Sequence, residues 1–149
     1  MNYDSTSDTL NHIKRVGVLI HKMIFTLFNR VDNHDSSKLR TPEKEIFDEY
    51  TPKLKSSTYG SEEYNVFLKE MKKALDNHYA LNSHHPEHYT NGIDNMDLID
   101  IIEMICDWKA ASERHTDGNI YESIKINKKR FNISDQLEQI LINTVKRYL

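Results

Sequence analysis

The sequence predicts a compact, single-domain, all-α bundle of about six or seven helices that spans residues 1–149. Its 149 residues include only four glycines and three prolines, too few for the many tight turns of an all-β fold. Apolar residues recur at intervals of three and four along most of the chain, as they do on one face of an α-helix. The sequence has no internal repeat and no linker-like stretch, so one domain is expected.

The first half of the chain is expected to form three helices. Asp8 can cap the first of these, which carries a long apolar face. A second helix is expected to start at residues 41–43, because proline and glutamate suit the first turn of a helix. Residues 51–60 contain proline and glycine and are expected to form a loop. From Ser61 onward an unbroken apolar stripe predicts a third helix, and this stripe places His78 on the buried face.

The second half is expected to contain a loop followed by three further helices. Residues 83–95 hold proline, glycine and three histidines, and long loops between rigid elements often carry functional groups. Asn95 can cap a central helix over about residues 96–114, with apolar residues on two sides. A shorter helix follows residue 118, and Ser134 caps the last helix.

Composition argues against several classes of function. The formal net charge is −3 and the pI is 6.2, so the chain lacks the positive surface that broad binding to duplex nucleic acid requires. Apolar runs are short, and neither a membrane span nor secretion is expected. The single cysteine, Cys106, cannot form an internal disulfide, which fits a cytoplasmic protein. Eight histidines in a chain of this size are the most distinctive feature.

Two features of the sequence favour a metal site. His34 and Asp35 are adjacent in a polar segment, and neutral imidazole and ionised carboxylate are suitable ligands for divalent metals. The alternative is a loop pair in which Asp35 caps the following turn. Asp107 lies on the central helix between its apolar sides, where a carboxylate needs a partner or a metal. The alternative for Asp107 is a solvated helix face that also contains Asp100 and Glu103.

These residues resemble the motifs of the HD-domain superfamily of metal-dependent phosphohydrolases. Members of that superfamily carry H-x-x-R-V on an early helix, then H-D-x-x-K, and finally an aspartate on a later helix. The chain has matching runs at residues 12–16 and 34–38, followed by Asp107. The resemblance implies an HD-domain-like fold. It also implies four metal ligands and one cation that faces the phosphate: His12, His34, Asp35 and Asp107 as the ligands, and Lys38 as the cation.

The chain is also similar to an uncharacterised family of phage and bacterial proteins of comparable length. The similarity lies in three blocks, which are residues 34–38, 78–89 and 103–111. Their length makes the blocks specific, but they imply no reaction, because the activity of that family is not established.

A second group of histidines is expected to hold a second cation or a substrate phosphate. Its members are His78, His84 and His85. For His78 the alternative is a core histidine with a single backbone partner. His12 and His21 lie at similar angles from the apolar face of the first helix, so only the resemblance favours His12 as the ligand. Three histidines are expected to lie outside the metal site: His21, His88 and His115.

Together these assignments predict a metal-dependent phosphohydrolase that acts on a small phosphorylated metabolite, with nucleotides as the favoured class. One or two divalent ions (Fe, Mn, Zn, Co or Mg) would polarise the phosphoryl group and activate a water, with Asp35 and Lys38 as the catalytic residues. The candidates for binding a second phosphate are Arg15, Lys109 and Arg114. Two alternatives stay open, namely a non-catalytic HD-fold protein that binds a nucleotide or a host protein, and a di-iron oxygenase. Assembly as a homo-oligomer also stays open.

Overall fold

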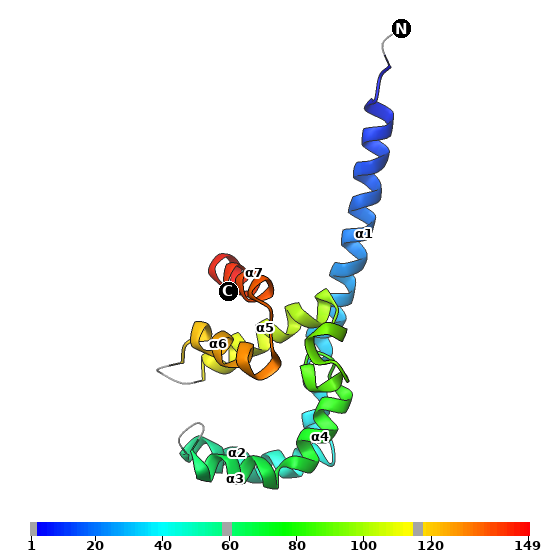
Figure 1. The fold of residues 1–149 in the computed structure, drawn as a ribbon. Coiled ribbons are helices and arrows are strands. Elements are labelled where there is room, and N and C mark those ends of the chain that lie inside the picture. The colour runs from blue at the N-terminus through cyan, green and yellow to red at the C-terminus, as the bar shows by residue number, and fades with distance from the viewer. Residues whose placement is uncertain (1–2, 58–60, 115–117) are drawn as a thin grey trace. The chain divides into compact units, whose positions relative to one another are not determined.

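The computed structural model describes residues 3–57, 61–114 and 118–149. Over these ranges it contains seven α-helices, three short 3-10 helices and no strand, so the all-α prediction is confirmed (Figure 1). The chain divides into two units, one that ends at His34 and one that begins at Asp35. Each unit is described by itself, and the single domain over the whole chain stays a prediction.

The first unit contains one long helix, α1 (Thr6–Asn33). It begins two residues before Asp8, which therefore lies in its first turn, where a carboxylate interacts favourably with the positive end of the helix dipole. Apolar side chains recur along it at intervals of three and four, as the sequence predicts. No helix among the described residues is long and apolar enough to cross a membrane.

The second unit begins with η1 (Ser36–Leu39) and three helices, α2 (Glu43–Ser56), α3 (Glu62–Glu70) and α4 (Lys72–Leu81). Helix α2 packs against both η1 and α4. The loop predicted for residues 51–60 is wrong up to Ser56, because α2 continues through Pro52. Pro52 is exposed, so water can bond to the backbone carbonyl whose helical partner the proline removes.

The single helix predicted from Ser61 onward is divided at Met71 into α3 and α4. Met71 keeps right-handed helical backbone angles (φ −76°, ψ −2°), and its side chain is buried. The spacing of apolar residues continues through such a turn, so periodicity could not locate the break.

After α4 come η2 (Pro86–His88), η3 (Gly92–Asn95) and three helices, α5 (Leu98–Ser112), α6 (Ile120–Phe131) and α7 (Asp135–Tyr148). The predicted loop over residues 83–95 is therefore a loop with two short 3-10 turns. Helix α5 begins two residues later than predicted. Asp97 caps it in place of Asn95, and the side chain of Asp97 accepts hydrogen bonds from the backbone N–H groups of Ile99 and Asp100.

The main core lies between α5, α6 and α7. Its buried apolar residues are Met104, Ile105, Trp108, Ile120, Ile124, Ile133, Leu141 and Val145. Two residues of the predicted apolar face of α5, Leu98 and Ile102, are exposed instead, whereas Asp100 and Glu103 are buried. The polar stripe of α5 is therefore an inward-facing surface over these two residues, and the interpretation of it as a solvated face is wrong for them.

Candidate metal centre

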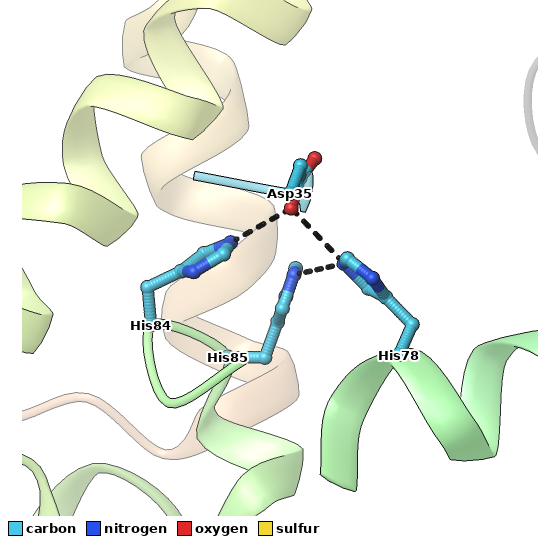
Figure 2. A group of neighbouring side chains, drawn as sticks. All are labelled: Asp35, His78, His84 and His85. Atoms are coloured by element: carbon cyan, nitrogen blue, oxygen red, sulfur yellow. Dashed lines mark hydrogen bonds and ion pairs between the residues drawn. The ribbon is translucent and has the colours of Figure 1, made fainter. Parts of the chain in front are cut away.

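Four side chains of the second unit converge on one point, and we call them the His/Asp cluster. They are Asp35, His78, His84 and His85, and each offers one ligand atom within 4.8 Å of the others. Figure 2 shows the three imidazole rings directed towards Asp35, with His78 on a helix and His84 and His85 on the adjoining loop. Asp35 precedes η1, His78 lies in the last turn of α4, and the other two histidines directly precede η2.

The spacing of the ligand atoms fits a single metal ion. His78 Nε2 lies 2.9 Å from His85 Nε2 and 3.2 Å from Asp35 Oδ1, and His84 Nε2 lies 3.5 Å from the same oxygen. Metal–ligand bonds of about 2.1 Å place neighbouring ligand atoms roughly 3.0 to 3.4 Å apart. The three separations lie within or just outside this range, so they are compatible with neighbouring positions around one ion.

A buried carboxylate orients His78. Glu43, at the start of α2, is fully buried, and its Oε2 accepts a hydrogen bond from His78 Nδ1 at 2.9 Å. Asn77 donates to Oε1 of Glu43 at 2.8 Å, and Ser37 donates to Oε2 at 2.9 Å. A hydrogen bond donated by His78 Nδ1 to Glu43 leaves Nε2 as the nitrogen that can bind a metal at the cluster. Carboxylates of this kind orient metal-binding histidines and increase their basicity.

A second carboxylate has the same position relative to His84. Glu103 on α5 is 9% exposed, and its Oε1 lies 3.1 Å from His84 Nδ1. The Nε2 atom of His84 thus also faces Asp35. Two histidines from different segments are therefore held by buried carboxylates with their Nε2 atoms towards one point, which is the arrangement of carboxylate–histidine–metal sites.

The electrostatics favour the ligand forms that bind metals. Burial tends to raise the pKa of Asp35, but the contact with His78 and the charge and hydrogen bond of Lys38 hold it well below its usual range. Lys38 Nζ lies 2.5 Å from Asp35 Oδ2. Burial and the neighbouring His84 and His78 lower the pKa of His85 to about 3, so this imidazole is neutral near pH 7. Metals bind ionised carboxylate and neutral imidazole.

The backbone at Asp35 also contributes to the site. Asp35 has φ 54° and ψ 14°, in the left-handed region that aspartate enters more readily than most residues. This conformation lies between the end of α1 and the start of η1. Local strain of this kind is common where a side chain is held for function.

The structure brings together four of the predicted ligands in a combination that the sequence did not predict. Asp35 was assigned to one ion and the three histidines to a second ion or a phosphate, yet all four residues share one centre. Asp107 is half-buried on α5, and its charge raises the pKa of His85 against the other influences. His34 is the last residue of the first unit, and His12 lies on α1. The ligand roles of Asp107, His34 and His12 stay predictions.

The other predicted residues are placed as follows. Lys38 lies in η1 beside Asp35, and Lys109 forms an ion pair with Glu113 on α5. Arg114 is exposed just beyond α5, and Arg15 lies on α1. Their assignments to substrate stay predictions.

The histidines predicted to lie outside the site have other surroundings where they are described. His88 Nδ1 lies 2.8 Å from the backbone carbonyl of Tyr79, and His21 Nδ1 lies 2.8 Å from that of Gly17. His115 lies outside the described residues.

Sequence reasoning missed the residues that hold the ligands, above all Glu43 and Asn82. Glu43 is a typical first-turn glutamate, a position that helix capping alone explains, so its role had no sequence signal. Asn82 donates to Ser37 Oγ at 2.9 Å and to the His78 carbonyl at 2.8 Å. The motif block over residues 78–89 contains Asn82, and this block was the one signal that could have identified it.

Comparison with known proteins gives a family but no function. The model of a family of unknown function, DUF5662, matches residues 1–147. Neither the comparison with curated proteins nor that with solved structures finds a significant match.

Proposed function

We propose that this chain, which belongs to the family of unknown function DUF5662, is a metal-dependent phosphohydrolase of the HD-domain type. Its substrate would be a small phosphorylated metabolite, with nucleotides as the first class to test. The observation that carries the proposal is the pair of buried carboxylates, Glu43 and Glu103, which turn His78 and His84 towards Asp35. The order of the motifs at residues 12–16 and 34–38, followed by Asp107, adds the resemblance to the HD-domain superfamily.

The ligand set favours a catalytic metal over a structural one. Structural zinc sites are closed and usually contain cysteine, whereas catalytic sites use histidine and carboxylate and keep a position open. The side chains of Asp35 and Lys38 are 17% and 32% exposed, whereas the ligand atoms Asp35 Oδ1 and His84 Nε2 are buried, so an open position would lie on the Lys38 side of the cluster. Three imidazoles and one carboxylate suit Zn, Fe, Co or Mn better than Mg, which prefers oxygen ligands.

The residues around the cluster can do what phosphoryl hydrolysis requires. A bound divalent cation polarises a phosphoryl oxygen and lowers the pKa of a water molecule. Lys38 stands beside Asp35 and can neutralise charge that develops on the phosphoryl group. Asp107, half-buried on α5, can orient a water at the cluster. The buried carboxylates Glu43 and Glu103 keep the imidazoles in one tautomer throughout.

Metal content and phosphate release test this proposal together. The purified full-length chain would be analysed by mass spectrometry for bound metals, alongside the variants Asp35→Ala and His84→Ala. His88→Gln is the matched control, because it removes a histidine of the same loop that lies outside the cluster.

We expect the wild type and His88→Gln to retain about one metal ion per chain, and the two cluster variants to lose it. The metal-loaded protein would then be assayed for phosphate release from nucleoside mono-, di- and triphosphates and from cyclic dinucleotides. Equal metal content in all four proteins would refute the site. A metal-loaded chain that releases no phosphate from any of these compounds would refute phosphohydrolysis of nucleotides.

A further inference from the structure

The loop that carries His84 and His85 is fastened to α5 at both of its ends by one buried carboxylate. Asp100 is 1% exposed, and its Oδ1 accepts a hydrogen bond from Ser83 Oγ at 2.7 Å. Its Oδ2 accepts a hydrogen bond from Tyr89 OH at 2.6 Å. Ser83 directly precedes His84, and Tyr89 directly follows η2. The two contacts therefore bracket the segment that supplies two of the four cluster residues.

The same carboxylate is also part of the start of α5. Asp100 and Asp97 form a reciprocal capping box, in which the backbone N–H of Asp97 donates to Asp100 Oδ2 at 3.3 Å. The capping box therefore fixes Asp100 at the start of α5, one turn before Glu103, and Glu103 contacts His84. Asp100 and Glu103 lie three residues apart and so share one face of α5.

We propose that Asp100 is a positioning residue for the His/Asp cluster and that it acts through Ser83 and Tyr89. It is not one of the four residues of the His/Asp cluster. Its role is to hold the loop at a fixed position along the axis of α5, so that His84 contacts Glu103 and His85 contacts His78. This inference deepens the proposed function and rests on it only for the claim that the cluster binds a metal.

A carboxylate is better suited to this role than a neutral side chain. Its two oxygens accept from Ser83, Tyr89 and the Asp97 N–H, and hydrogen bonds to a charged acceptor are shorter and stronger than neutral ones. Burial and the bond to Asp100 raise the pKa of Tyr89, so the phenol keeps its proton and remains a donor. Two donors on the loop and one on the helix thus meet at a single buried anion.

The hydrogen bonds on the loop side can be removed without removing those that cap the helix. Ser83→Ala and Tyr89→Phe each remove one loop contact to Asp100, together with the bond between Ser83 and Tyr89, and leave the capping box of α5 in place. Asp97→Ala is the matched control, because it removes the cap but leaves both loop contacts to Asp100. Asp100→Asn completes the set, and the loop variants carry the test if this protein fails to fold.

Two readouts on the full-length chain separate positioning from stability. The first is titration with Co(II), which gives a dissociation constant and a visible absorption spectrum that reports ligand geometry. The second is the set of imidazole NMR signals of His84 and His85 in the metal-free protein. Thermal unfolding midpoints of the metal-free variants measure the structural contribution.

We expect Ser83→Ala and Tyr89→Phe to weaken Co(II) binding about tenfold, as loss of an outer hydrogen bond typically does, and to alter the spectrum. The imidazole signals of His84 and His85 should also shift in both variants. Asp97→Ala should lower the unfolding midpoint of the metal-free protein by at least as much as Ser83→Ala and Tyr89→Phe lower it. It should nevertheless keep the Co(II) affinity within about twofold of the wild type and leave the imidazole signals unchanged.

The inference would be overturned if Co(II) affinity followed the unfolding midpoint in all variants, Asp97→Ala included. It would also be overturned if the imidazole signals of Tyr89→Phe matched those of the wild type. Failure of the wild type to bind Co(II) would count against the proposed function, and the imidazole signals alone would then decide whether Asp100 positions the two histidines.

Discussion

Glu43→Gln should weaken metal binding without weakening the metal-free fold. Glutamine has nearly the shape of glutamate, and its amide oxygen can still accept from His78 Nδ1. Its amide nitrogen takes the place of the oxygen that accepts from Asn77 and can donate to the Asn77 amide oxygen once that amide turns over, so the main loss is the negative charge. Loss of such an outer partner typically lowers metal affinity 10- to 100-fold, which corresponds to about 1.4 to 2.7 kcal/mol. The metal-free protein no longer buries a charge at this fully buried position, so its stability should stay level or rise.

The assay measures two quantities: the zinc affinity, which should fall, and the stability of the metal-free chain, which should stay level or rise. Competition with a chromophoric zinc chelator gives the zinc affinity, and thermal unfolding in EDTA gives the stability of the metal-free chain. Wild-type protein should gain about 2.7 kcal/mol of stability when free zinc is 100 times its dissociation constant. At the same zinc concentration, Glu43→Gln should gain about 1.4 kcal/mol if its affinity falls tenfold and about 0.4 kcal/mol if its affinity falls 100-fold.

A matched double variant sharpens the prediction. Glu103→Gln acts on His84 as Glu43→Gln acts on His78, and because both histidines would bind the same ion, the double variant should lose at least as much affinity as either single variant. Unchanged zinc affinity in both single variants would refute the role that we assign to the buried carboxylates.

Three further predictions concern the catalytic cation, the pH dependence and the core. Lys38→Met should lower phosphate release at least about tenfold, because it removes a cation from the site, and should leave the metal content unchanged; a matching loss of metal would contradict this role. The pKa of His85 is about 3 in the folded chain, below its usual value, so the unfolded chain binds more protons than the folded chain between these two pKa values. The stability of the metal-free protein should therefore fall as the pH drops from about 7 to 4, and it should fall less steeply in His85→Gln. Urea denaturation at several pH values would measure both slopes. Leu141→Ala should cost about 2 to 5 kcal/mol in urea denaturation, because it leaves a cavity between α5, α6 and α7, and a loss below about 1 kcal/mol would contradict the core assignment.

The helical fold could be predicted from spacing because each amphipathic helix carries its own period. The predicted helix boundaries are wrong where the backbone changes but the spacing of apolar residues does not. Pro52 lies within α2 on an exposed face, and Met71 divides α3 from α4 without interrupting the apolar stripe. Neither feature changes the sequence pattern that the prediction used.

The sequence could predict which residues have side chains suited to bind a metal, but it could not predict which of them lie together. Asp35, His78, His84 and His85 were all identified as ligand types, but the sequence could not place Asp35 with residues more than forty positions away. Glu43 has the sequence character of an ordinary first-turn glutamate, and its function appears only when α2 packs against α4. Likewise, the sequence could not decide whether Asp100 and Glu103 face solvent, because that depends on the loop packed against α5.

The central claim is that one divalent cation binds where the three imidazoles meet Asp35, and anomalous diffraction tests it most directly. Crystals of the full-length chain grown with Zn(II) would be measured above and below the zinc absorption edge. We predict an anomalous peak about 2.0 to 2.2 Å from Nε2 of His78, His84 and His85 and from an oxygen of Asp35. A zinc peak elsewhere in the chain, with no density among these four side chains, would contradict the account.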